Sequence, residues 1–522
     1  MELILTDFLD RAVMIYGKKE AIVDQDENTH TYQEVNRRVQ QLSHGLDSLG
    51  VRKGDRVAYL APNTLEMYEG FYGVFQTGAV MVSLNTRLKP EDYRFILDHS
   101  ESKVLFVDYE LVPLIEPIVE QLETVEHIVV HGRDKEENGM AGYNSWLASF
   151  PETPFPRADV KEDDTATLLY TSGTTGNPKG VMLTHRNNYL HALSIQHHLR
   201  VSDRDTLIHI LPMFHVNGWG SPFYYTANGA TQVMQKKVIP EEILEKAKKY
   251  EATVMHMAPT VLNGLISKYH ELKPPIPETM RLVIAGSAPP KAFVKEIEEE
   301  IGWEFYQVYG MTESSPLSTA SYISTEEDAL KGDEYYEAKA KAGLEVISTK
   351  VRVVDETGEE VQRDGKEVGE VIVKGPGVMK GYWKNDEETN RTIQNGWLYT
   401  GDMGTIDDRG RVAITDRKKD IIISGGENIS SIEVESVFYD HPDIQEAAVI
   451  ALPHEKWGET PHAIIVQKEG SGLTEEKVIQ FSKKKLAHFK CPTSVTFIEE
   501  LPKTASGKIQ KVKLRNLVGE DK

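Results

Sequence analysis

A glycine- and hydroxyl-rich segment, residues 170–180, constrains this chain more than any other part of its sequence. It reads Tyr-Thr-Ser-Gly-Thr-Thr-Gly-Asn-Pro-Lys-Gly and follows a short apolar run, residues 166–170. Glycine lets the backbone approach a ligand closely, and backbone N–H groups, hydroxyls and a lysine together suit the oxygens of a polyphosphate. Lys179 is followed by Gly180 rather than by Ser or Thr, so the segment is not a Walker loop, and it contains no dinucleotide fingerprint. We therefore predict a phosphate-binding loop of another kind.

The overall charge of the chain restricts the ligands that it can hold. Its 522 residues carry a formal net charge of −22, which argues against non-specific binding to nucleic acid. Local lysines and helix N-termini must therefore hold a polyphosphate against an unfavourable field, which salt screens beyond about 8–10 Å. A chain of this length exceeds one hydrophobic core, so we expect two or more domains.

The cysteine content, the start of the chain and one uncharged stretch bear on location. Cys491 is the single cysteine, which excludes an intramolecular disulfide and any multi-cysteine metal site and favours a reducing cytoplasm. The first residues do not have the basic segment of a signal peptide. Residues 206–235 contain no Asp, Glu, Lys or Arg, but Pro212 and Pro222 argue against a membrane-spanning helix. We expect no integral membrane segment and predict that this stretch is buried around an apolar cavity.

Alternating helix and strand patterns predict an α/β protein. Two successive rounds of apolar strands and amphipathic helices indicate two packed subdomains with parallel sheets covered by helices. The strands are expected at 55–60, 103–107, 127–131, 206–211, 253–257 and 282–285, and the helices at 32–49, 67–77 and 241–250.

The pattern changes after residue 342. Short strands that begin near residues 351, 369, 397 and 411 are separated by glycine turns, which indicates a small β-rich subdomain. The last hundred residues alternate again and predict a separate α+β domain. Its elements are expected at 431–439 and 474–486 for helices and at 447–452, 463–468 and 494–499 for strands.

Five further segments complete a pattern that resembles the adenylate-forming superfamily of acyl-CoA synthetases, luciferases and peptide-synthetase adenylation domains. They lie at residues 284–290, 307–313, 399–402, 416–420 and 501–511, so the resemblance covers nearly the whole chain. It implies a large AMP-binding domain (1–416) with the ATP and acyl sites, a hinge (417–420) and a mobile C-terminal domain (421–522) with a catalytic lysine. Relatives often dimerise through the large domain, so a homodimer is one expected state.

The resemblance assigns a nucleotide and a metal to this site. Tyr309 offers a flat face to adenine, Asp402 accepts hydrogen bonds from the ribose hydroxyls, and Arg417 assists ribose and phosphate. Glu313 supplies a hard oxygen suited to Mg²⁺, with Thr171 near the metal. The implied ATP and AMP contacts are Thr171, Ser172, Gly173, Thr174, Thr175, Gly176, Lys179, Gly286, Ser287, Ala288, Gln307, Tyr309, Gly310, Thr312, Asp402, Arg417 and Lys508.

Lys508 is the implied catalytic lysine. An ionised carboxylate must attack the α-phosphorus of ATP, and a lysine that reaches both anions offsets their repulsion and orients the attack. No general base is required, because the nucleophile is already ionised near pH 7. The alternative for Lys508 is a surface lysine in a basic tail. Lys419 maps to the hinge, where many relatives carry Asp.

The uncharged stretch carries the implied acyl site. His215 maps to a histidine that lines the acyl carboxylate, and it is grouped with Glu313 and Lys508 as a catalytic residue. Trp219 resembles a tryptophan that gates an alkyl tunnel in fatty-acyl-CoA synthetases, although the same pattern occurs in relatives that act on methylthiopropionate. Plain core packing is the alternative for both side chains. The implied acyl contacts are His215, Val216, Trp219 and Gly286.

A second face of the C-terminal domain is implied to receive CoA after adenylation. Two adjacent glycines in residues 424–429 would let the pantetheine arm run beside the backbone. Lysines near residues 483–490 could receive the CoA phosphates, but such a run is more often exposed to solvent. The implied CoA contacts are Gly425, Gly426, Glu427, Trp457 and Lys490.

We therefore expect a ligase that activates a medium- or long-chain fatty acid as acyl-AMP with ATP and Mg²⁺, releases diphosphate and transfers the acyl group to CoA. The alternatives within this class are a short-chain, methylthioalkanoate or aryl-acid CoA ligase and a stand-alone enzyme that loads a carrier protein. A luciferase-like oxygenase and a non-catalytic nucleotide sensor are the alternatives from other classes. The expected partners are therefore small molecules: a carboxylic acid, ATP and CoA.

Overall fold

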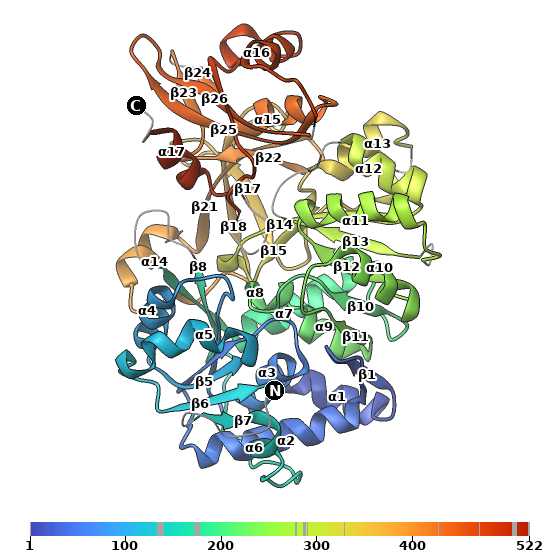
Figure 1. Cartoon of the computed structure of the whole chain (residues 1–522), viewed down its shortest axis with the longest axis vertical. Coiled ribbons are helices and arrows are strands. Elements are labelled where there is room, and N and C mark those ends of the chain that lie inside the picture. The colour runs from blue at the N-terminus through green and yellow to red at the C-terminus, as the bar shows by residue number, and fades with distance from the viewer. Residues whose placement is uncertain are drawn as a thin grey trace.

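The computed structural model describes residues 2–132, 140–171, 178–276, 279–285, 289, 291–327, 329–425, 427–468, 470–503 and 509–519. In these ranges the chain forms four β-sheets with helices packed on them. In Figure 1 the fourth sheet lies at the top, and the third lies between it and the two large sheets.

The first sheet has eight strands, and its central strands are parallel. Their apolar runs, such as Val104–Val107 within β5, are buried on both faces, as parallel strands covered by helices require. Only β9 and β19 run antiparallel to their neighbours, at the edge of the sheet. The order is β19 (Gly381–Tyr382), β9 (Lys179–Thr184), β8 (Thr165–Thr171), β4 (Val80–Ser83), β3 (Arg56–Leu60), β5 (Ser102–Asp108), β6 (His127–His131) and β7 (Ala141–Gly142).

The second sheet has nine strands and takes its last two from the N-terminus of the chain. β1 pairs in parallel with β11 rather than with any strand of the first sheet. The order is β16 (Leu344–Glu345), β15 (Leu317–Ala320), β14 (Glu304–Gly310), β13 (Arg281–Ile284), β12 (Val254–Met257), β10 (Thr206–His209), β11 (Thr231–Met234), β1 (Glu20–Val23) and β2 (Thr29–Thr31).

Helices cover both large sheets, and α3 is buried along its whole length. It carries Glu69, which is fully buried and is paired with Arg38, and the hydroxyl of Tyr143 donates to Glu69 across 2.9 Å. A buried carboxylate needs such partners. The helices are α1 (Thr6–Tyr16), α2 (Tyr32–Ser48), α3 (Leu65–Gln76), α4 (Pro90–Ser100), α5 (Val112–Ile115), α6 (Tyr143–Leu147), α7 (His185–His198), α8 (Val216–Trp219), α9 (Ser221–Asn228), α10 (Pro240–Lys249), α11 (Pro259–Leu272), α12 (Lys291–Lys295) and α13 (Asp333–Ala340).

The third and fourth sheets each have five strands. All pairings in the third sheet are antiparallel, whereas β27 joins the fourth in parallel beside β26. The third sheet contains β17 (Lys350–Val354), β18 (Gly369–Lys374), β20 (Ile393–Gln394), β21 (Trp397–Ile406) and β22 (Val412–Arg417), with α14 (Asp386–Thr392) beside it. The fourth contains β23 (Ile422–Ser424), β24 (Glu427–Ile429), β25 (Ile444–His454), β26 (Gly458–Gln467) and β27, with α15 (Ser431–Tyr439), α16 (Glu475–Lys483) and α17 (Lys511–Gly519); β27 spans Ser494–Phe497.

The fold class expected from the sequence is confirmed: two large α/β layers, a small β-rich part and a C-terminal α+β part. The uncharged stretch 206–235 forms β10, α8, α9 and β11 and is almost entirely buried. No helix in the described part of the chain is long and apolar enough to cross a membrane.

Candidate active site

Glu313 is a buried carboxylate at the point where the second sheet meets β19. It lies on a 3₁₀ turn, Thr312–Ser314, directly after β14. Its Oε1 accepts a hydrogen bond of 2.9 Å from the hydroxyl of Tyr382. Burial raises the pKa of Glu313, while the hydrogen bond from Tyr382 and the charges of Arg417 and Lys179 oppose that rise. Side chains from β9, β19 and β22 therefore surround one carboxylate.

Asp402 connects two residues that the sequence assigns to the nucleoside. Its Oδ2 accepts a 2.9 Å hydrogen bond from the hydroxyl of Tyr309, and its Oδ1 pairs with Nε of Arg417 at 2.9 Å. The register of β21 and β22 places Asp402 directly opposite Arg417. Burial and the charge of Asp402 raise the pKa of Tyr309, so the phenol keeps its proton and remains a donor. The predicted ribose carboxylate, adenine face and arginine thus lie together.

The predicted phosphate loop leaves and re-enters the first sheet at its edge. Thr171 ends β8, Lys179 begins β9, and the two residues are register partners. The ammonium of Lys179 forms an ion pair with Glu388 of α14 and lies 5.3 Å from the centre of the Tyr382 ring. Five predicted contacts fall between these strands and lie outside the described residues: Ser172, Gly173, Thr174, Thr175 and Gly176.

The remaining nucleotide residues follow β13 and β14. The strands are parallel neighbours, and Ile284 is the register partner of Gln307. A Cβ on Gly310 would lie 1.7 Å from the carbonyl oxygen of Pro316, so this glycine is needed for the close passage of two backbones. Thr312 is buried beside Glu313. The predicted contacts Gly286, Ser287, Ala288 and Lys508 lie outside the described residues.

The two residues that the sequence assigns to a metal ion both offer oxygen donors. Glu313 supplies a carboxylate and Thr171 a hydroxyl, both hard oxygen donors. No group of three or more His, Cys, Asp or Glu that could hold a metal occurs among the residues whose placement is described. Mg²⁺ usually binds one or two protein carboxylates together with phosphate oxygens, so a carboxylate and a hydroxyl are donors of the kind that it accepts.

The predicted acyl segment forms an unusual left-handed turn. Val216, Asn217, Trp219 and the two glycines among them have φ between 44° and 78°. Positive φ is costly for bulky residues, so packing must hold this turn in place. The amide of Asn217 donates to the hydroxyl of Thr167 across 3.0 Å, and the Trp219 ring stacks on His256 with centroids 5.9 Å apart. His215 directly precedes the turn and is half-buried.

The predicted CoA residues lie in the fourth sheet and beside it. Gly425 has φ of 61°, and a Cβ there would lie 2.9 Å from the Trp457 ring, so a glycine is required. Trp457 and Glu427 are exposed, whereas Lys490 forms a 2.7 Å ion pair with Glu433. The adjacent Gly426 lies outside the described residues.

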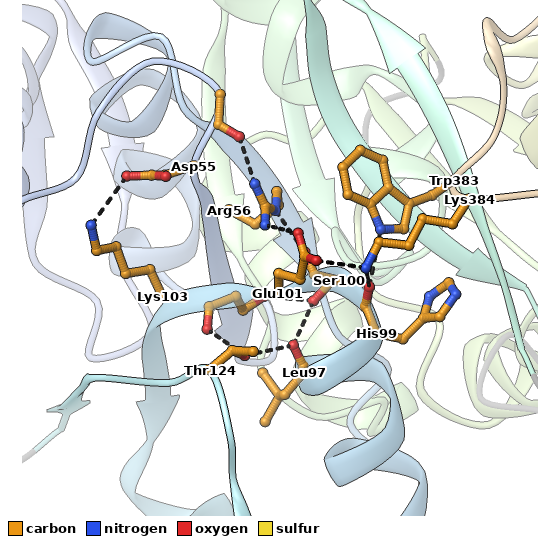
Figure 2. Close-up of polar contacts among 12 residues, drawn as sticks. Asp55, Arg56, Leu97, His99, Ser100, Glu101, Lys103, Thr124, Trp383 and Lys384 are labelled. Carbon is orange, nitrogen blue, oxygen red and sulfur yellow. Dashed lines mark hydrogen bonds and ion pairs between the residues drawn. The ribbon is translucent and has the colours of Figure 1, made fainter.

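Two site residues, Tyr382 and Glu388, were not predicted from the sequence. They flank a segment that is fastened to β3 and α4 (Figure 2), and the backbone N–H of Trp383 also donates to the carbonyl oxygen of Gly180 in β9 across 2.7 Å. The indole N–H of Trp383 donates to the carbonyl oxygen of His99 across 3.0 Å. Lys384 and Arg56 both reach the carboxylate of Glu101, at 2.7 and 2.6 Å. The anchored segment holds Tyr382 against Glu313 and carries α14 to Lys179.

The sequence matches known proteins over nearly its full length. Residues 9–383 match the family described as AMP-binding enzyme, and residues 433–508 match the AMP-binding enzyme C-terminal domain. The chain is 38% identical to a long-chain-fatty-acid–CoA ligase of Thermus thermophilus, over 98% of this chain and 95% of that protein. It is 37% identical to a peroxisomal butyrate–CoA ligase of Arabidopsis thaliana, over 98% and 92%. A crystal structure of an anthranilate CoA ligase in complex with anthranoyl-AMP superposes with a TM-score of 0.91 at 29% identity, over 100% and 98%.

Proposed function

Because this chain belongs to the AMP-binding enzyme family and is an acid–thiol ligase of the acyl-CoA ligase type, we propose that its substrate is a medium- or long-chain fatty acid. In this proposal the acid is activated by ATP in the presence of Mg²⁺ and is then transferred to CoA. The observation that carries it is the convergence of Glu313, Lys179, Asp402 and Arg417 on one site, and the uncharged stretch 206–235 would receive the acyl chain.

The first half-reaction joins two anions. A carboxylate oxygen attacks the α-phosphorus of ATP, the new P–O bond forms acyl-AMP, and pyrophosphate leaves. Asp402 and Tyr309 would hold the nucleoside, while Lys179 and Arg417 would offset the charge on the phosphates. Mg²⁺, held by Glu313 and Thr171, would withdraw charge from the phosphate oxygens. Lys508 would reach both reacting groups and orient the attack.

The second half-reaction forms the thioester. The CoA thiolate attacks the acyl carbon of acyl-AMP, and AMP leaves. We propose that the chain divides into domains at 1–416 and 421–522 and that residues 417–420 act as the hinge between the two half-reactions. The backbone N–H of Asp420 donates to the carbonyl oxygen of Arg417 across 2.8 Å, so residues 418–420 form a tight turn directly after β22, which ends at Arg417. Gly425, Gly426, Glu427 and Trp457 would then face the pantetheine arm.

The acyl chain would enter beside Trp219. The Thermus relative is named for long-chain acids. In this chain, residues 206–235 contain no Asp, Glu, Lys or Arg that would face an alkyl chain. A smaller acid is the second candidate, favoured by the stack of Trp219 on His256, whose Nε2 lies 3.1 Å from the hydroxyl of Tyr225. This packing would close the pocket behind a short or aromatic acid. Cys491 is free and buried, which favours a reducing location such as the cytoplasm.

The deciding experiment is pyrophosphate release from purified protein across a panel of acids, from butyrate to palmitate with cinnamate and anthranilate, with and without CoA. Highest kcat/KM for an acid of eight or more carbons, with thioester formed only when CoA is present, would support the proposal. A preference for butyrate or an aryl acid would instead support the second candidate, a smaller acid.

Lys508→Ala should cripple adenylation but spare thioester formation from supplied acyl-AMP. Equal loss of both half-reactions would contradict the proposed role of Lys508 in adenylation.

A further inference from the structure

The lysine of the phosphate loop is already neutralised by a carboxylate of the protein. Lys179 begins β9, and Glu388 lies 209 residues later on α14, yet their side chains form an ion pair. Both side chains are largely shielded from water, with 27% of Lys179 and 15% of Glu388 exposed. A half-buried ion pair of this kind is screened less than one at the surface.

Several contacts hold Glu388 in this position. The side chain of Asn385 caps α14 by accepting a hydrogen bond of 3.1 Å from the backbone N–H of Glu388. Arg391, one turn later, pairs with the second carboxylate oxygen at 2.5 Å. The preceding residues, Trp383 and Lys384, are fastened to α4 and to the loop that follows it, as Figure 2 shows. These contacts fix the position of α14, so the carboxylate of Glu388 is held beside the ammonium of Lys179.

The charge state of Glu388 suits this role. Burial tends to raise its pKa, but hydrogen bonds from Lys179 and Arg391 outweigh burial and leave the pKa below the ordinary value. The side chain is therefore a carboxylate at neutral pH. It offers the ammonium of Lys179 the same kind of oxygen that a phosphate would offer, so the two anions compete for one cation.

We propose that Glu388 is an exchangeable counter-ion of Lys179, displaced by the phosphates of ATP and restored when pyrophosphate leaves. This inference rests on the proposed function, because it takes ATP as the ligand of the loop. Glu388 touches no substrate and acts through Lys179, so it is a positioning residue. It lowers affinity for ATP and for pyrophosphate without affecting AMP, and it thereby favours departure of pyrophosphate after adenylation.

The test uses binding, so that it does not depend on turnover. Full-length wild-type protein, Glu388→Gln and Glu388→Asp are titrated calorimetrically with α,β-methylene-ATP, pyrophosphate and AMP in Mg²⁺, without acid or CoA. Glu388→Gln should bind the ATP analogue and pyrophosphate about tenfold more tightly, the size of one charge-assisted hydrogen bond. Its affinity for AMP should stay within about twofold of wild type, and Glu388→Asp should fall between the two.

Two controls separate this role from a structural one. Glu387→Gln removes the same charge from the exposed neighbour on α14 and should leave all three affinities unchanged. In a Lys179→Met background, Glu388→Gln should no longer change affinity for the ATP analogue, because the cation for which the two anions compete is gone.

Equal or weaker binding of the ATP analogue by Glu388→Gln would overturn the proposal, as would a parallel change for AMP or an effect that persists in Lys179→Met. In steady state, KM for ATP should fall in Glu388→Gln while kcat does not rise. If no acid supports pyrophosphate release in wild type, the proposed function fails, whereas the titration of the ATP analogue still decides the role of Glu388.

Discussion

The hydroxyl of Tyr382 donates a 2.9 Å hydrogen bond to Oε1 of Glu313 and so joins the edge of the first sheet to the end of a strand in the second. Burial and the neighbouring Glu313 carboxylate both raise the pKa of Tyr382, so the phenol remains a donor throughout the neutral range. Its ring also lies beneath the Lys179 ammonium. One residue thus contacts both the proposed metal ligand and the proposed phosphate lysine.

Tyr382→Phe should weaken the Mg²⁺-dependent step while preserving the ring beneath Lys179. Loss of a hydrogen bond to a charged group costs about 1.5–3 kcal/mol, which corresponds to a decrease in kcat/KM of at least about tenfold. Pyrophosphate release measured against Mg²⁺ concentration should show a higher half-saturation point. Tyr336→Phe, which removes a 2.7 Å hydrogen bond from another phenol to the carboxylate of Glu299, is the matched control. Identical Mg²⁺ curves for wild type and Tyr382→Phe would contradict this role.

Trp219→Ala should change the preference for acyl chain length. Trp219 is buried and stacked on His256, so its removal opens space at the end of the proposed acyl site. Each methylene accommodated there contributes about 1 kcal/mol, so the ratio of kcat/KM between long and short acids should shift about thirtyfold over two carbons. Trp303→Phe, at a buried tryptophan that packs on Tyr269, should leave the ratio unchanged. A profile from butyrate to palmitate that matches wild type would exclude Trp219 as the gate.

Lys419→Pro should separate the two half-reactions. Proline fixes φ at 419 and restricts the residue before it, within a turn that the proposal needs to rotate. Acyl-dependent exchange of pyrophosphate into ATP should persist, whereas the rate of CoA transfer should fall about tenfold or more. Lys419→Ala keeps the backbone free and should behave as wild type. CoA transfer at the normal rate in Lys419→Pro would count against rotation at this turn.

Glu327→Gln should destabilise the fold at neutral pH but much less in acid. Burial tends to raise the pKa of Glu327, yet hydrogen bonds from Arg411 and from the backbone of Ser324 lower it to about 2. A carboxyl whose pKa is lowered by folding stabilises the folded state when the pH is above its ordinary pKa. This contribution is lost as the pH falls from about 4.5 to 2. The variant leaves the buried Arg411 without its charge partner, at a cost of about 3–5 kcal/mol at pH 7.

Denaturant unfolding at pH 7 and at pH 3 measures this difference. The difference in free energy of unfolding between wild type and Glu327→Gln should be clearly smaller at pH 3 than at pH 7, because pH 3 lies within the range over which the contribution is lost. Glu326→Gln, at the exposed neighbour, should match wild type at both values. A gap of equal size at pH 7 and pH 3 would show that the ion pair is not its source.

Elements with a clear local pattern could be predicted from the sequence. The expected strand 127–131 and helix 431–439 coincide with β6 and α15, because their apolar spacing reports directly which side faces the core. Asp402 and Arg417 were each assigned to the nucleotide only through the family motifs, and their ion pair was not predicted. In the structure it follows from the register of two adjacent antiparallel strands.

Other features have no local signal. β19 is two residues long, too short for any periodicity, and its pairing with β9 connects residues about 200 positions apart. The contact of Lys179 with Glu388 depends on that long-range pairing. From the sequence alone, the charged residues 386–388 therefore indicate only the solvent-exposed start of a helix. The left-handed turn at 216–220 includes Val216 and Trp219, which local preferences place at negative φ, and only tertiary packing overrides them.

The crossing of β19 into the first sheet also has a consequence for biosynthesis. A nascent chain that has emerged only as far as β9 presents that strand with an open edge, because its outer neighbour is still some two hundred codons from being translated. Unpaired edges invite association with other chains, so ribosome-bound or truncated forms that end before residue 381 are exposed to aggregation. The first sheet can be completed only after β19 has been synthesised and has paired with β9, so its completion is a late event in folding.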